Sequence, residues 1–380
     1  MSLEGYLPIA DHGLIGNHHT VALVGIDGTI DWYCCPRFDS PSLFGAILDK
    51  DKGGYFRIAP ENEGAKCKQF YFPATNVLIT RFLTPDGVGE VTDFMPVERP
   101  GELVGRQRLI RSVRVVRGQM AFNVEVEPRF DYGRRAHKVE VLKNGALFET
   151  PALTVALATR TPLERTRTGI RASLVLSGSD SASFTLEPVE EAMVPVPCSE
   201  RLAEELMRET VQYWRAWLAQ SNYRGRWREM VQRSALTLKL LTYKPTGAIV
   251  AAPTTSLPEQ MGGPRNWDYR YTWIRDSAFS LHALLLLGFK DSAEQFMGWL
   301  TDRFQEMKEM EHGRLQIMYR VDGSSDLEEE ELDHLEGYCG SRPVRIGNGA
   351  ANQLQLDIYG ELIDAIYVHN RYGGPIYYEA

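Results

Sequence analysis

The sequence predicts two parts, an N-terminal antiparallel β-sandwich followed by a mainly helical part. Before Pro197 the chain consists of many short strand-like runs separated by Gly, Pro and Asp turns, with almost no helical periodicity. After Pro197 the apolar residues recur at helical spacing. The chain length of 380 residues also exceeds what one hydrophobic core usually spans, so two structural units are expected.

Two β-hairpins are the clearest features of the first part. Asp27-Gly28 separates the strand-like runs 19–25 and 29–34, and Pro85-Asp86-Gly87 separates the runs 77–84 and 88–94. Further strands are expected at short spacing, over residues 54–58, 110–116, 121–126, 146–150, 153–158, 172–177 and 183–186. Short strands with turn residues between them are typical of an antiparallel sandwich.

Helices are expected over residues 200–220, 226–242, 277–287, 292–305 and 349–369. Ser199 is placed to cap the first of them, which we expect to bridge the two parts. The predicted organisation is therefore a β-sandwich domain at 1–198, a linker helix at 199–222 and a helical domain at 223–380. Long loops between its helices are expected to carry functional residues.

Composition excludes several classes of protein. A net charge of −8 argues against a nucleic-acid partner, which would require a basic face. No run of apolar residues is long enough to cross a bilayer, and the N-terminus has no secretory signal. Five scattered cysteines suit reduced thiols, and no spacing resembles a zinc, dinucleotide or phosphate-loop site. We expect a cytoplasmic protein without metal, cofactor or membrane partner; nothing specifies its oligomeric state.

The segment NWDYRYTWIRDS, residues 266–277, is the richest in chemistry. Its aromatic residues alternate with polar ones, so an extended chain would show all four rings on one side; they are Trp267, Tyr269, Tyr271 and Trp273. Charged residues crowd the same stretch; they are Asp268, Arg270, Arg275 and Asp276. Aromatic faces beside planar charged groups suit a sugar, whose C–H faces pack on rings while its hydroxyls pair with Arg and Asp.

This segment has simpler explanations as well. Alternating aromatic residues also fit a half-buried edge strand, and Asp276 could serve only as the N-cap of the apolar helix that follows. The density of charged residues favours a binding site over a plain strand.

The second segment of interest is 337–364. On a helical wheel one apolar stripe faces a polar side, and Glu361 lies at the seam between them. The apolar stripe comprises Ala351, Leu354, Ile358, Leu362 and Ala365, and the polar side comprises Gln353, Asp357, Gly360 and Asp364. A carboxyl at such a seam is partly desolvated, which favours the protonated form that a general acid needs.

The neighbours of Glu361 fit this role. Asp357 lies four residues earlier and could orient Glu361 or add negative charge. Gly360 costs about 1 kcal/mol relative to alanine inside a helix, a cost that is understandable if it leaves room for a ligand beside Glu361. An ordinary amphipathic helix with solvent-facing acids fits the wheel equally well.

The chain resembles glycoside hydrolase family 15, the group of glucoamylases, glucodextranases and bacterial or archaeal trehalases. Residues 13–49 resemble the opening of the sandwich domain in prokaryotic members. WDYRYTWIRDSA is similar to the first substrate-binding loop of the family, and GSRPVRIGNGAANQLQLDIYGE is similar to the trehalase-type segment that carries the general acid. The resemblance covers essentially the whole chain.

This resemblance implies an (α/α)6 barrel that hydrolyses α-glucosidic bonds with inversion and releases glucose. It places Arg275 and Asp276 on the hydroxyls of the glucose at the cleavage point, with Tyr269 close to the reacting ring. Arg342 would belong to a loop lining the pocket, and Glu361 would be the general acid. With Trp267 and Asp357, these residues form the predicted site.

Two departures from the family pattern bear on the substrate. Glucoamylases have two adjacent glutamates where this chain has Gly360-Glu361, so the assignment of the acid depends on the trehalase-like variant. Glucoamylases also have a tryptophan where this chain has Gly340-Ser341, which indicates a different aglycone. Trehalose is therefore the expected substrate; the alternatives are α-glucan ends, or sugar binding without turnover by a truncated protein.

An inverting enzyme of this kind needs two carboxyl groups roughly 6.5–9.5 Å apart, a general acid and a base that activates water. In the family the base comes from later in the barrel, and no candidate for it occurs within residues 1–380. We therefore expect the base beyond residue 380, residues 223–380 to form the N-terminal part of the barrel, and the 380-residue chain alone to be inactive.

Overall fold

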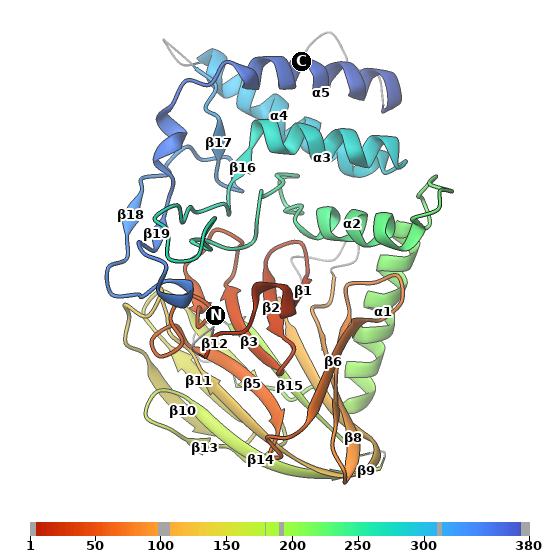
Figure 1. The fold of residues 1–380 in the computed structure, drawn as a ribbon, viewed down its shortest axis with the longest axis vertical. Coiled ribbons are helices and arrows are strands. Elements are labelled where there is room, and N and C mark those ends of the chain that lie inside the picture. Colours follow the sequence, from red (N-terminus) through yellow and green to blue (C-terminus); the bar gives the residue numbers. More distant parts are fainter. Residues whose placement is uncertain (1–4, 98–106, 179, 190–193, 310–313, 374–380) are drawn as a thin grey trace. The chain divides into compact units, whose positions relative to one another are not determined.

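The computed structural model describes residues 5–97, 107–178, 180–189, 194–309 and 314–373 (Figure 1). The chain divides into two compact units, Met1–Arg215 and Ala216–Ala380. We call them the β unit and the helical unit. In the described residues, no helix combines the length and the apolar character that crossing a membrane requires.

The β unit is built from antiparallel strand pairs (Figure 1). The strands are β1 (His12–Gly16), β2 (Val21–Gly25), β3 (Thr29–Cys34), β4 (Ser42–Phe44), β5 (Tyr55–Pro60), β6 (Lys66–Tyr71), β7 (Leu78–Leu83), β8 (Gly87–Phe94), β9 (Leu109–Glu127), β10 (Lys138–Leu142), β11 (Gly145–Glu149), β12 (Thr154–Ala158), β13 (Glu164–Arg165), β14 (Ile170–Ser177) and β15 (Ser181–Val189), preceded by the 3-10 turn η1 (Ile9–Asp11). Both predicted hairpins are confirmed, as β2–β3 and β7–β8. The prediction of an antiparallel β domain is therefore confirmed.

The long strand β9 joins the two halves of this unit. Its first half pairs with β8 and β15, and its second half pairs with β5 and β14. The change falls near Gly118, whose φ is +77° and where an added Cβ would lie 2.0 Å from the Asp86 carbonyl oxygen. Only glycine fits such a position. The strands predicted at 110–116 and 121–126 are confirmed, but their separation is wrong, because Gly118 lets one strand bend and continue.

A buried ion pair fixes the first hairpin onto the core of the β unit. Arg111 and Asp93 are both fully buried, and Arg111 Nε donates to Asp93 Oδ1 at 2.7 Å. The same guanidinium donates to the carbonyl oxygens of Phe56 at 2.5 Å and Gly28 at 2.8 Å. Because several hydrogen bonds satisfy the guanidinium, its burial is tolerated and the Gly28 turn is held in place.

The helical unit contains most of the helices that the sequence predicts (Figure 1). The helices are α1 (Glu200–Leu218), which contains the boundary between the units, α2 (Arg228–Leu240), α3 (Ile274–Leu286), α4 (Lys290–Glu309) and α5 (Asp357–Tyr372). Shorter elements are β16 (Thr272–Trp273), β17 (Met318–Tyr319), β18 (Glu330–Glu331), β19 (Arg345–Ile346) and the 3-10 turns η2 (Tyr338–Gly340) and η3 (Gly349–Asn352). The first four predicted helices are confirmed with small shifts at their ends.

The fifth predicted helix, 349–369, begins too early. Residues 349–352 form η3, capped by the Asn348 side chain, which accepts a hydrogen bond from the Ala350 N–H. Gln353 then adopts an extended conformation, with φ −74° and ψ 152°, and α5 begins only at Asp357. Leu354 is consequently 58% exposed and does not belong to the buried stripe. The helical wheel assumes one continuous helix over 349–369, so it does not show the break between η3 and α5.

Candidate active site

Three predicted residues come together where α3 and α5 begin. Arg275, in the first turn of α3, donates from Nη1 to Asp357 Oδ2 at 3.0 Å, and Asp357 is the first residue of α5. Its Nη2 lies 3.4 Å from Asp276 Oδ2. The hydrogen bond to Asp357 is the main cause that raises the pKa of Arg275 above its ordinary value. The guanidinium therefore stays charged between two carboxylates; we call these three residues the arginine cluster.

The arginine cluster remains open to solvent. The exposed fractions of the side chains are 35% for Arg275, 47% for Asp276 and 44% for Asp357. Gln355, just before α5, adds an amide oxygen 3.4 Å from Arg275 Nη1. Charged and polar groups that are held in place but still accessible can hydrogen-bond the hydroxyl groups of a ligand.

Two aromatic rings lie next to this cluster. The Arg275 guanidinium lies 5.5 Å from the centre of the Trp273 ring, and the Trp273 and Tyr269 ring centres are 6.2 Å apart. Trp273 is 9% exposed, whereas Tyr269 is 36% exposed. Burial, helped by Glu259 and Asp276, raises the pKa of Tyr269. Tyr269 therefore offers a neutral aromatic surface beside charged groups, the combination that a sugar ring requires.

The simple role suggested for Asp276 does not hold. The residue that precedes α3 is Trp273, with no side-chain cap, and Asp276 lies inside the first turn. A negative charge there is favourable for the helix dipole, but such an effect is modest at an exposed position. The prediction of Asp276 as an N-cap is therefore wrong, and its carboxylate is available for other contacts.

The alternation of aromatic residues does not place four rings on one side. Only Thr272–Trp273 forms a strand, and Tyr271 is 2% exposed against 36% for Tyr269. The charged residues between them, Asp268 and Arg270, are 0% and 1% exposed. They bind each other through Nε–Oδ1 at 2.9 Å and Nη2–Oδ2 at 2.6 Å. Of the four charged residues that crowd this segment, Asp268 and Arg270 therefore form a buried pair, whereas Arg275 and Asp276 remain accessible.

Trp267 contacts Arg345 and not the residues of the arginine cluster in the described structure. The guanidinium of Arg345 covers one face of its ring at 4.5 Å from the centre. Arg345 is itself held by Glu331 at 3.0 Å and by the Pro264 carbonyl oxygen at 2.9 Å. One face of Trp267 is therefore occupied by the protein, and only the remaining exposed part of this half-buried ring could contact a ligand.

Arg342 is exposed and lies in a loop that contacts the start of the segment 266–277, which we call the first motif. Asn266 Nδ2 donates to the Pro343 carbonyl oxygen at 3.2 Å, and the Gly262 N–H donates to Ser341 Oγ at 2.9 Å. These contacts place residues 341–343 beside 262–266. The place of Arg342 in a loop that lines the pocket stays a prediction.

Glu361 lies one helical turn after Asp357 in α5 and is partly buried. Among the described residues, its side chain makes no hydrogen bond or ion pair. A Cβ added at Gly360 would meet no atom within 4 Å, so the space next to it is open. That this space accommodates a ligand beside Glu361, and that Glu361 is the general acid, both stay predictions.

The sequence did not assign two residues of this region to the site. Trp273 was noticed as one of the alternating rings, and its place directly before Ile274-Arg275-Asp276 was the available signal. Gln355 carried no such signal, because its position next to Arg275 results from a contact between residues 80 positions apart.

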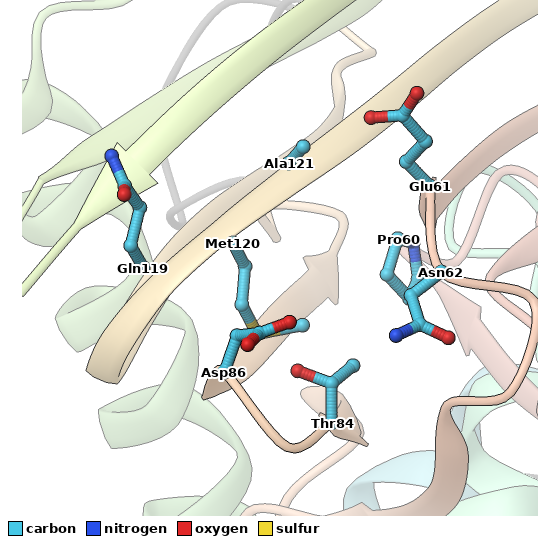
Figure 2. A pocket seen from close by; sticks show the side chains of 8 residues that line it. All are labelled: Pro60, Glu61, Asn62, Thr84, Asp86, Gln119, Met120 and Ala121. Atoms are coloured by element: carbon cyan, nitrogen blue, oxygen red, sulfur yellow. The ribbon is translucent and has the colours of Figure 1, made fainter.

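Two cavities of the described residues lie apart from the predicted site residues. One in the β unit, of about 320 Å³, is shown in Figure 2; it is lined by Pro60, Glu61, Asn62, Thr84, Asp86, Gln119, Met120 and Ala121. Another, of about 450 Å³, lies in the helical unit between the end of α4 and residues 314–326. The candidate site is therefore defined by its converging side chains.

The chain combines an antiparallel β unit, a set of helices and an arginine cluster beside aromatic rings. Residues 3–196 match the family model "Trehalase-like, N-terminal", and residues 225–379 match "Glycosyl hydrolases family 15". The chain belongs to glycosyl hydrolases family 15 and carries the trehalase-like N-terminal domain.

Curated relatives cover nearly the whole chain. A trehalase of Thermoplasma volcanium is 39% identical over 379 residues, which are 99% of this chain and 59% of that protein. A trehalase of Mycolicibacterium smegmatis is 39% identical over 392 residues, covering 95% of this chain and 57% of that protein. A trehalase of Mycobacterium tuberculosis is 38% identical, with coverages of 95% and 56%. The chain thus spans less than two thirds of the length of these relatives.

A solved structure described as a putative kojibiose phosphorylase from human microbiome is also similar. Its TM-score is 0.47 at 10% sequence identity, covering 82% of this chain and 49% of that chain. A similarity of this size adds nothing to the assignment of the fold or the activity.

Proposed function

We propose that this sequence belongs to an enzyme that hydrolyses α-glucosidic bonds with inversion and releases glucose, with α,α-trehalose as its substrate. The observation that carries this proposal is the arginine cluster beside Tyr269. There the first motif meets the segment 337–364, which we call the second motif. Family membership and three curated trehalases at 38–39% identity support the choice of reaction and substrate.

Each residue receives a role from its position. Arg275 and Asp276 bind hydroxyl groups of the glucose unit at the cleavage point, and Asp357 holds the guanidinium in place. Tyr269 and Trp273 contact the C–H face of the ring. Arg342 and the exposed part of Trp267 contact the other sugar unit.

The proposed chemistry needs an acid and a base. Glu361 protonates the leaving oxygen, because its partly buried carboxyl shares the side of α5 that begins at Asp357. The base that activates water belongs to the part of the curated relatives that this chain does not span. No cofactor or metal takes part in this proposal.

We propose further that the helical unit is the first part of an (α/α)6 barrel, with residues 199–222 as the linker helix between domains 1–198 and 223–380. Helices α3 and α5 pack against each other, yet both carry large exposed apolar residues. Phe279 and Leu286 on α3 are 58% and 51% exposed, and Ile363 and Tyr367 on α5 are 67% and 57% exposed. Further barrel helices would cover such apolar faces.

A cytoplasmic location is part of the proposal. Cysteines of cytoplasmic proteins are normally reduced. In the described structure no disulfide joins any of the cysteines Cys34, Cys35, Cys67, Cys198 and Cys339.

A substrate comparison tests the function. A form of the protein with the full length of the curated relatives is assayed for glucose release from trehalose, maltose and longer α-glucans. Trehalose is expected to give a kcat/KM at least about 100-fold above that of maltose, because the second sugar must fit a different pocket. A preference for maltose would indicate a glucoamylase-type enzyme. Saturable trehalose binding without glucose release would indicate a sugar-binding protein.

A further inference from the structure

The Asp268 carboxylate is the centre of a buried network in the first motif. Its side chain is 0% exposed, and Arg270 binds both of its oxygens. The Arg270 backbone N–H also donates to Asp268 Oδ1 at 3.1 Å, and the Tyr271 hydroxyl donates to Asp268 Oδ2 at 3.0 Å. A buried carboxylate with this many charge-assisted and neutral donors is rigidly held.

This network extends to the second motif through two contacts. The Gly347 N–H donates to the Tyr271 hydroxyl at 3.0 Å, and Asn348 Nδ2 donates to the Asp268 carbonyl oxygen at 3.1 Å. Gly347 has φ +74°, and a Cβ there would lie 1.8 Å from the Glu328 carbonyl oxygen. The turn at Gly347, within the second motif, is therefore fixed, with its N–H donating to the Tyr271 hydroxyl.

The second motif meets the first again where α5 begins. Residues Gln355 and Asp357 bind Arg275, so the segment 347–357 is attached to the first motif at both of its ends. Between these ends lies η3, which Asn348 caps. Because the segment 347–357 is short, a displacement of Gly347 also displaces the first turn of α5.

We propose that Tyr271, oriented by Asp268, is a positioning residue. It places the start of α5, which carries Asp357 and Glu361, relative to the glucose-binding groups of α3. This inference depends on the proposed function. The Asp268–Arg270 pair is bidentate without the Tyr271 hydroxyl. Removal of the hydroxyl therefore mainly affects Gly347, because its buried N–H would lose its hydrogen-bond acceptor.

Tyr271→Phe keeps the ring and removes only the hydroxyl. The variant is assayed on the substrate that the unaltered protein hydrolyses. We expect its kcat to be about 10- to 100-fold lower, because a small misplacement of reacting groups has a large effect on rate. KM should change less than about threefold, because Arg275, Asp276 and Tyr269 stay on the first motif. Hydrogen–deuterium exchange of peptides within 347–357 should become faster.

Tyr71→Phe is the matched control. Tyr71 is half-buried in β6 of the β unit, and its hydroxyl accepts from the Leu14 N–H at 2.7 Å, a contact within that unit. Like Tyr271→Phe, this change removes a hydroxyl that accepts from a backbone N–H, so the melting temperature should fall, while kcat and exchange over 347–357 should stay unchanged.

Asn348→Ser supplies a second variant if Tyr271→Phe folds poorly. Serine can still cap η3, but its shorter side chain does not reach the Asp268 carbonyl oxygen, so kcat should again fall with KM preserved. An unchanged exchange rate over 347–357 in Tyr271→Phe would contradict the positioning role even in a protein without measurable hydrolysis. Absence of hydrolysis in the unaltered protein would contradict the proposed function alone.

Discussion

Asp276→Asn is expected to lower kcat/KM for trehalose by roughly 10²- to 10⁴-fold in a form of full family length, with little change in melting temperature. A carboxylate accepts hydrogen bonds from two sugar hydroxyls, and each charge-assisted bond contributes about 1.5–3 kcal/mol. The amide presents an NH₂ group to one of these hydroxyls and leaves it poorly paired. Stability should change little because Asp276 caps no helix and its side chain is 47% exposed.

The matched control is Asp302→Asn, which makes the same change at an exposed position on α4. It should leave both kcat/KM and the melting temperature unchanged. If Asp276→Asn lowered the melting temperature strongly but kept kcat/KM per folded molecule, Asp276 would be a structural residue and the proposed sugar contact would be wrong.

Glu361→Gln is expected to lower kcat for trehalose by about 10³-fold or more, because the glutamine cannot donate a proton to the leaving oxygen. The same variant should retain much more of its activity on α-glucosyl fluoride. Fluoride departs with far less help from a proton, so its hydrolysis depends less on a general acid. The ratio of the two losses, measured by steady-state kinetics, reports the role of Glu361.

Glu294→Gln provides the control, since Glu294 is an exposed glutamate on α4. It should affect neither substrate. Equal losses on trehalose and on the fluoride in Glu361→Gln would exclude Glu361 as the general acid. Asp357, whose carboxylate binds Arg275, would then be the next candidate within this chain, to be compared with carboxylates outside residues 1–380.

The parts of the fold that local sequence patterns specify were predicted well. Hairpins with Asp-Gly turns and helices with a clear apolar face depend on residues close together in the sequence. Strand β6 was missed because its side chains alternate between exposed and half-buried, so Lys66 and Lys68 dilute the apolar signal. The continuity of β9 was not predicted, because the chain passes Gly118 at a positive φ, a conformation that the sequence alone does not reveal.

The candidate site was predicted in its residues and less well in its geometry. The sequence named Arg275, Asp276 and Asp357, but a contact across 82 residues cannot be read from spacing. The sequence showed Asp268 and Arg270 only as part of a crowd of charges, and charged residues are rarely buried fully, so their burial could not be predicted. Their burial is possible only because they pair with each other and because Tyr271 and Asn348 bind Asp268, contacts that exist only in the folded chain.

The configuration of the glucose released from trehalose tests the central claim most directly. Both units of α,α-trehalose have the α configuration. Inversion at the attacked carbon yields one β-glucose, while the departing unit keeps its α configuration. Proton NMR during the first minutes of hydrolysis should therefore show α- and β-glucose in equal amounts before mutarotation. Release of α-glucose alone would show retention and contradict the proposed mechanism, and absence of glucose from a full-length form would contradict the proposed activity.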